Sequence, residues 1–130
     1  MPIPASQATP GEIVAPDRRL RRNQRLTSSA DFQDTYAQGR SGAERTLVMW
    51  LRQGPGASLR LGVVASRVVG PAVQRNRARR LLREAWRLNR HRFQGEVDVV
   101  LVARKPLPKA KWDDVTADLL RLAKRAGLLA

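Results

Sequence analysis

The pattern of hydrophobic and polar positions predicts three helices and three strands, in the order α, β, β, α, β, α. The first helix covers residues 30–38, with Ser28 as a candidate N-cap and Gly39 as a candidate C-terminal stop. Phe32 and Tyr36 are four residues apart and therefore share one face of this helix. We expect that face either to pack against a sheet or to present its two rings to a ligand.

Two strands follow the first helix, at residues 46–52 and 59–66, and the Gly/Pro-rich segment 53–58 separates them. A loop of this composition is typical of a β-hairpin, so we expect the two strands to pair antiparallel. Side chains alternate along a strand, so the residues at 47, 49 and 51 share a face that we expect to lie in the core. The opposite face carries Trp50 and Arg52, an aromatic ring and a charge.

The third strand, residues 97–103 (VDVVLVA), is rich in β-branched residues and almost continuously apolar. We expect it to be the central strand, buried on both faces. A long helix precedes it, from about residue 72 to 90, with its apolar residues in one arc and a stripe of arginines on the opposite side. The last helix, residues 112–126, repeats apolar residues at a spacing that predicts packing against the sheet.

Charge narrows the choice of partner. The 130 residues include 25 Lys and Arg against 11 Asp and Glu, a formal net charge of +14 that favours a polyanionic partner. The length suits one domain, which we place at residues 18–130. Residues 1–17 contain four of the eight prolines and no Lys or Arg, so we expect a disordered N-terminal leader. No apolar segment is long enough for a membrane helix, and we expect a cytoplasmic protein without a membrane partner.

Few residues could carry catalysis. The chain has no cysteine and one histidine, which excludes a zinc cluster or a Cys/His pair. His91 lies among arginines at a helix end, where we expect a surface role. Asp114 and Asp118 are four apart on a helix and could hold hydrated magnesium, but we expect a solvated helix face. We therefore expect no catalytic residue and no metal site in this polypeptide.

The most informative segment is residues 75–92, which holds eight arginines and one acid, Glu84. Like charges four apart on a helix repel each other by a few tenths of a kcal/mol per pair, so folding alone explains this density poorly. Phosphate groups would turn the repulsion into attraction, and arginine suits forked hydrogen bonds to phosphate. The segment predicts nucleic-acid binding. Exposed aromatic rings beside it would receive unpaired bases, although core packing of these rings is an equal alternative.

Three motifs together carry a resemblance: residues 61–67 (LGVVASR), 70–77 (GPAVQRNR) and 78–84 (ARRLLRE). They resemble the bacterial ribonuclease P protein component, and the similarity extends over roughly residues 24–126. The resemblance implies an α-β sandwich with a small, mostly antiparallel four-stranded sheet and three helices, of the ribosomal protein S5 domain 2-like class. It also implies a rare left-handed βαβ crossover and a short extra strand near residues 39–44.

In that family the RNA subunit is the catalyst and uses Mg²⁺ to remove the 5′ leader of precursor tRNA, while the protein is a binding cofactor. The resemblance therefore implies two RNA partners, the catalytic RNA and the precursor tRNA, and no stable protein partner. The residues it places on the catalytic RNA are Arg75, Asn76, Arg77, Arg79, Arg80, Arg83 and Arg87. The residues it places in a cleft for the single-stranded leader are Phe32, Tyr36, Trp50 and Arg67.

The sequence departs from the family pattern at the cleft. Ser66-Arg67-Val68 has one basic residue where the family often has two lysines, while Tyr36 and Trp50 replace the usual Phe and Tyr and keep an aromatic ring. We expect leader binding to survive these changes. The alternatives from other classes are a ribosomal protein, a DNA-binding helix-turn-helix regulator and a free-standing protein nuclease.

Overall fold

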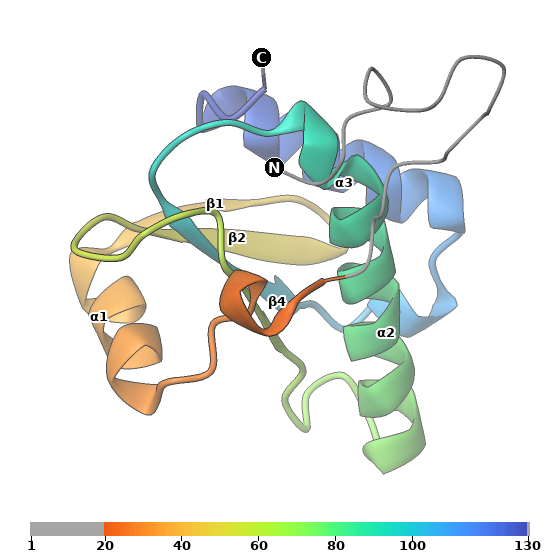
Figure 1. Cartoon of the computed structure of the whole chain (residues 1–130). Helices are drawn as coiled ribbons and strands as arrows, with labels where there is room; N and C mark the ends of the chain where they lie inside the picture. Colours follow the sequence, from red (N-terminus) through yellow and green to blue (C-terminus); the bar gives the residue numbers. More distant parts are fainter. Residues whose placement is uncertain (1–19, 130) are drawn as a thin grey trace, which may run out of the picture.

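Figure 1 shows the fold as a computed structural model, which describes residues 20–129. The predicted leader, residues 1–17, lies outside the described residues, and its disorder stays a prediction. The helices and strands, in chain order, are the 3₁₀ helix η2 (Arg22–Gln24), α1 (Ser29–Gln38), β1 (Arg40–Ala43), β2 (Leu47–Arg52), β3 (Leu61–Val64), α2 (Ala72–Asn89), η3 (Arg90–Arg92), β4 (Asp98–Ala103), η4 (Leu107–Lys109) and α3 (Trp112–Arg125).

The four strands form one sheet in the order β1-β2-β4-β3. β2 pairs antiparallel with β1 and β4, while β3 runs parallel to β4 and is joined to it through α2. This confirms the mostly antiparallel four-stranded sheet with three helices. The short strand expected near residues 39–44 is β1. The left-handedness of the crossover stays a prediction.

The hairpin expected of the strands at residues 46–52 and 59–66, now β2 and β3, is wrong, because β4 lies between them. Val99, Val100 and Leu101 of β4 are fully buried, so the central position covers both of its apolar faces. Neighbouring strands are about 4.8 Å apart, and the eight residues between Arg52 and Leu61 easily cross two such spacings. The composition of the loop predicts that the chain turns back after β2. It does not predict that β4 lies between β2 and β3.

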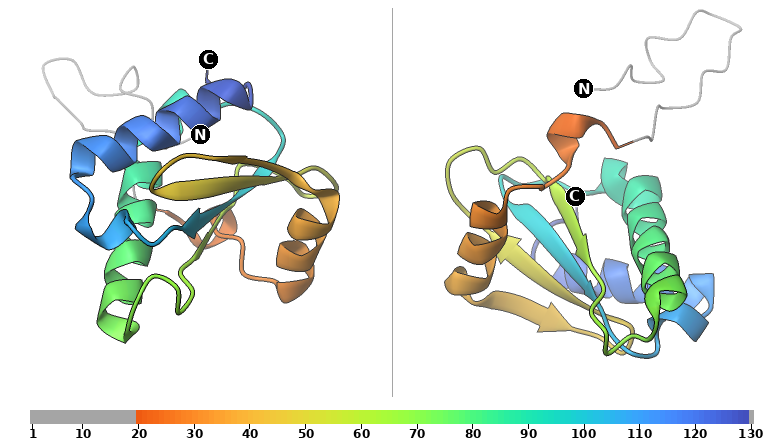
Figure 2. Two further views of the ribbon diagram at one scale, coloured as in Figure 1. Left: turned by 180° about the vertical axis from the view of Figure 1, so that it is seen from behind. Right: turned by 90° about the horizontal axis from the view of Figure 1, so that it is seen from below.

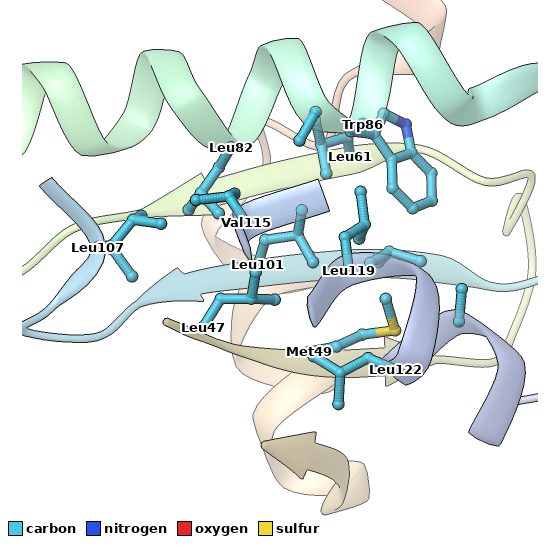
Figure 3. Close-up of a cluster of buried hydrophobic side chains, with 14 of the residues drawn as sticks. Leu47, Met49, Leu61, Leu82, Trp86, Leu101, Leu107, Val115, Leu119 and Leu122 are labelled. Carbon is cyan, nitrogen blue, oxygen red and sulfur yellow. The ribbon is translucent and has the colours of Figure 1, made fainter. Parts of the chain in front are cut away.

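The helices lie on both faces of the sheet, with α2 and α3 on one face and α1 on the other (Figure 2). The core between the sheet, α2 and α3 holds the large apolar side chains (Figure 3). Leu47, Met49 and Leu51 of β2 point into it, as the alternating pattern predicts. Trp86 of α2 is fully buried there and packs its ring against Phe93, 4.6 Å between ring centroids.

The caps predicted for α1 are confirmed. Ser28 Oγ accepts a hydrogen bond from the Asp31 backbone N–H at 3.4 Å, and Gly39 ends the helix with a φ of +67°. Thr35 is the one fully buried residue of α1, so this helix lies on the sheet with little hydrophobic anchorage. Within residues 20–129, no helix is long and apolar enough to cross a membrane.

Candidate nucleic-acid interface

Three aromatic rings gather on the face of the sheet that α1 covers. Tyr36 from α1 and Trp50 from β2 meet edge to face, with ring centroids 5.2 Å apart. Phe32, one turn earlier on α1, lies directly against Gly62 of β3, where a Cβ atom would come within 2.5 Å of Phe32 Cζ. Tyr36 is exposed, whereas Phe32 and Trp50 are half-buried. The rings therefore remain partly accessible to a ligand.

The strand register continues this aromatic cluster into an apolar strip. Trp50 is paired with Val100, and Val100 with Gly62, so these residues form one row across the sheet. We call the three rings together with the next row the aromatic surface. That next row consists of three half-buried valines, Val48, Val102 and Val64.

Basic residues border the aromatic surface at both ends. A hollow of about 290 Å³ beside Phe32 is lined by Arg25 from the N-terminal segment and Arg83 from α2. A second hollow of about 440 Å³ lies where β3 and β4 end, and it is lined by Arg45, Arg104 and Lys105 among others. Among residues 20–129, no acidic side chain lines either hollow. The combination of exposed rings and unopposed positive charge suits a single-stranded polyanion with stacking bases.

The structure thus brings together Phe32, Tyr36 and Trp50 of the predicted cleft. Arg67 is exposed in the turn after β3, between Ser66 and Val68, which line the second hollow, but it is not itself a lining residue. The sequence reasoning did not assign Arg45, Arg104 and Lys105 to the site. The sequence does contain a signal for Arg104 and Lys105, because both cations directly follow the central strand. A surface site can form where such a strand ends.

The predicted RNA-binding arginines of α2 divide into two groups. Within the described residues, Arg87 is the one arginine of α2 that pairs with a carboxylate, and its Nη2 lies 2.6 Å from Glu84 Oε2. The hydrogen bonds from Arg87 hold the pKa of Glu84 below its ordinary value. Arg77 donates through Nε to the Pro108 carbonyl at 2.9 Å, and Arg79 donates to the carbonyl of Ala65 and to Asn76 Oδ1.

The second group is unpartnered. Arg75, Arg80 and Arg83 make no side-chain hydrogen bond or ion pair with any of residues 20–129, and Arg80 and Arg83 are exposed. An arginine-rich face with a single neutralising acid is costly in isolation and favourable against phosphate. Arg77 and Arg79 hold the first turns of α2 against η4 and the end of β3, so they also orient that face.

The Asp114–Asp118 pair does not have the expected form. Asp114 is exposed, but Asp118 is buried, and its Oδ2 accepts from Thr46 Oγ1 at 2.6 Å and from the Thr46 N–H at 3.1 Å. Burial raises the pKa of Asp118, and the hydrogen bonds from Thr46 and Arg121 lower it by more, so the net pKa is low. Asp118 is therefore neither a magnesium ligand nor part of a solvated face, but a link between α3 and the start of β2.

The described residues contain no group of three or more His, Cys, Asp or Glu side chains that could hold a metal ion. His91 is exposed in η3, next to Arg90 and Arg92. Three carboxylates, Asp31, Asp34 and Asp98, do come together with arginines under α1, where they form ion pairs. The site is therefore equipped to bind and orient a nucleic acid.

Comparisons with known proteins place the chain among close relatives. A family model described as Ribonuclease P matches residues 20–127. The ribonuclease P protein component of Pelotomaculum thermopropionicum is 40% identical over 101 residues, covering 78% of this chain and 90% of the relative. That of Symbiobacterium thermophilum is 40% identical over 111 residues, covering 85% and 96%. The solved Staphylococcus aureus RNase P protein superposes with a TM-score of 0.71 at 28% identity, covering 82% of this chain and 98% of that one.

Proposed function

Because the chain belongs to the ribonuclease P protein component family, and so provides the protein part of a ribonucleoprotein endoribonuclease, we propose that it binds two RNAs through two separate surfaces. The arginine face of α2 binds the catalytic RNA. The aromatic surface binds the single-stranded 5′ leader of precursor tRNA. Bridging the two RNAs holds the leader beside the catalyst.

The observation that carries the first half is that α2 contains a single acid, Glu84. Glu84 is the single carboxylate paired with an α2 arginine within the described residues, so most of the positive charge of the helix is available to phosphates. Each phosphate contact releases condensed counterions and adds salt-dependent affinity. The residues we assign to this contact are Arg75, Asn76, Arg77, Arg79, Arg80, Arg83 and Arg87.

The second half follows from the chemistry that a leader of varying sequence requires. Stacking on aromatic rings and contacts to phosphate ignore base identity, and the aromatic surface with its basic borders offers both. We assign Phe32, Tyr36 and Trp50 to stacking and Arg67 to the phosphate chain. Arg45, Arg104 and Lys105 join Arg67 on the border of the surface.

Magnesium belongs with the RNA in this proposal. Ribonucleases of this family depend on Mg²⁺, but within residues 20–129 no carboxylate cluster fits a bound ion, and Asp118 is committed to Thr46. We therefore assign no metal ligand to the chain. Its own residues contribute binding and orientation, and raise the concentration of leader next to the RNA that hydrolyses the phosphodiester.

The test mixes the purified full chain, the catalytic RNA and a precursor tRNA at low magnesium, and omits each component in turn. We expect 5′-leader removal to need both the chain and the RNA, and the gain from the chain to grow with leader length up to several nucleotides. Cleavage by the chain alone would instead support a protein nuclease. If the chain leaves the activity of the RNA unchanged, that result would contradict the proposal. It would favour a structural RNA-binding role instead.

A further inference from the structure

Five charged side chains form a network under α1, and we call them the α1 network: Asp31, Asp34, Arg52, Arg60 and Asp98. Arg52, at the end of β2, is at the centre. Its Nη1 lies 3.0 Å from Asp98 Oδ2 on β4, and its Nε lies 2.9 Å from Asp34 Oδ2 on α1. Arg60 links the same two elements, because its Nη2 lies 2.7 Å from Asp98 Oδ2 and 3.4 Å from Asp31 Oδ2.

The network is fixed most firmly at its sheet end. Asp98 is fully buried, and its Oδ1 also accepts from the backbone N–H groups of Ser58 and Arg60, each at 3.1 Å. The Arg52 side chain is 8% exposed. The acids of α1 are more accessible, with 24% of the Asp31 side chain and 46% of the Asp34 side chain exposed. The sheet therefore presents two rigidly held guanidinium groups, and α1 docks its carboxylates on them.

This docking adds to the limited hydrophobic anchorage of α1, in which Phe32 packs against Gly62. Thr35 is its one fully buried residue, so apolar packing holds the helix weakly. At the C-terminal end of the helix, Gln38 supplements the network by exchanging hydrogen bonds of 2.7 and 2.8 Å with the backbone of Gln53. The position of α1 on the sheet therefore depends on polar contacts with the ends of β2 and β4 as well as on the packing of Phe32.

The same helix carries two of the three rings of the aromatic surface. Asp31 and Asp34 alternate along α1 with Phe32 and Tyr36, so a shift of the helix moves the carboxylates and the rings together. In the sheet, the row Arg52–Asp98 is two residues from the row Trp50–Val100, on the same face. The network therefore lies directly beside the surface to which the leader is assigned.

We propose that Asp34 and Arg52 are positioning residues for single-stranded RNA: their ion pair sets the place of α1 on the sheet and so the spacing of Phe32 and Tyr36 from Trp50. The inference rests on the proposed function, because it concerns the surface assigned to the leader. It predicts a change in the affinity for RNA that is opposite in sign to the change expected from charge alone. Removing an acid near bound RNA should tighten binding by charge alone, whereas breaking the Asp34–Arg52 ion pair weakens it.

The test uses three variants of the full chain in the reconstituted holoenzyme. Asp34→Ala removes the ion pair with Arg52 and places the best helix former in α1, so helix propensity does not fall. Asp34→Glu keeps a carboxylate that can still reach Arg52. Asp114→Ala is the matched control, since it makes the same charge change at an exposed position of α3, away from α1. The probes are two precursor tRNAs, with leaders of about eight nucleotides and of one nucleotide.

We expect Asp34→Ala to raise KM for the long-leader substrate about fivefold, the scale of a half-exposed ion pair, with unchanged kcat and unchanged KM for the short leader. Asp34→Glu should restore KM, and Asp114→Ala should leave it unchanged or lower it. Hydrogen exchange should become faster in α1 of Asp34→Ala and stay the same in α2, which is a readout independent of RNA.

Two results would overturn the inference, and they differ in meaning. If the unmodified chain distinguishes the two leaders and Asp34→Ala preserves that difference, the positioning role is wrong and the proposed function stands. If the unmodified chain does not distinguish the leaders, the aromatic surface does not bind leader, and the inference fails together with that half of the proposed function.

Discussion

Phe32 lies on Gly62 so closely that the ring occupies the place of a side chain: a Cβ atom on residue 62 would come within 2.5 Å of Phe32 Cζ and 2.7 Å of Cε1. This contact joins α1 to β3 across the sheet. It also fixes the ring at the edge of the hollow lined by Arg25 and Arg83. The bare backbone of one strand thus determines where this ring lies on the aromatic surface.

Gly62→Ala should therefore displace Phe32. We expect a decrease of about 1–3 kcal/mol in the free energy of unfolding from overpacking, and weaker binding of long-leader precursor tRNA. Chemical denaturation and KM measured with long and short leaders check both effects. The control is Gly42→Ala, where the new Cβ meets only the flexible Leu122 Cδ2 at 3.2 Å. Unchanged leader affinity in Gly62→Ala would show that the place of Phe32 does not matter for binding.

Trp50→Ala should remove a stacking platform from the aromatic surface and leave Tyr36 without its edge-to-face partner. Base stacking on an aromatic side chain is worth about 1–3 kcal/mol per base, so we expect the affinity for the leader to fall by about tenfold or more. Trp50→Phe should retain most of it. Trp112→Ala changes the same residue type at an exposed position of α3 and serves as control. Equal decreases in Trp50→Ala and Trp112→Ala would contradict a specific role.

The double variant Arg80→Gln/Arg83→Gln removes two unpartnered guanidinium groups from α2. We expect weaker binding of the catalytic RNA, and a slope of log K against log salt that is shallower by about 0.7–0.9 for each phosphate that the helix no longer binds. Filter binding over a range of salt concentrations measures the slope. Arg121→Gln is the control, because Arg121 is already paired with Glu44 and Asp118. A slope that does not change in the double variant would exclude these arginines from the interface.

Asp98 gives the fold a dependence on pH. Burial raises the pKa of Asp98, and the hydrogen bonds from Arg60 and from the backbone N–H groups of Ser58 and Arg60 lower it by more, so the folded-state pKa lies below the ordinary value. An Asp with a depressed folded pKa contributes stability that is fully present above its unfolded pKa, about 3.9, and is lost as the pH falls through the folded pKa.

The unmodified chain should therefore exceed Asp98→Asn in the free energy of unfolding by up to about 3–5 kcal/mol at pH 7, because the substitution removes the one fully buried carboxylate that faces Arg52 and Arg60. The difference should shrink as the pH falls below about 4. Urea denaturation between pH 7 and pH 2 measures it, with the exposed loop residue Glu96→Gln as a variant of equal charge change. A difference that stays constant down to pH 2 would contradict the role of the ionised carboxylate.

Local patterns predicted the elements well, because the information lies within a few residues. Ser28 and Gly39 bound α1 as expected, and the apolar arc of the long helix predicts the buried face of α2, including Ala78 and Trp86. The continuous apolar character of residues 97–103 predicts the central place of β4.

Contacts between distant residues were the ones that failed. Pairing of β2 with β3 was expected from the loop between them, but the choice of neighbour depended on β4, which comes later in the chain. Asp118 was expected with Asp114 on a solvated helix face, whereas its partner, Thr46, is 72 residues away. The role of Arg52 was also hidden, since the acids that surround it come from α1 and β4.

The sequence alone determined that this protein is a basic, RNA-binding α/β chain of the ribonuclease P family, because charge density, helix periodicity and the motif at residues 61–84 are local properties. The tertiary structure alone decided which charges are free to bind RNA and which hold the fold. Arg83 and Arg52 are the same residue type, yet Arg83 is exposed on α2 and Arg52 is buried among carboxylates. The physical reason is that the cost of an isolated charge depends on burial, and burial is set by the packing of the whole chain.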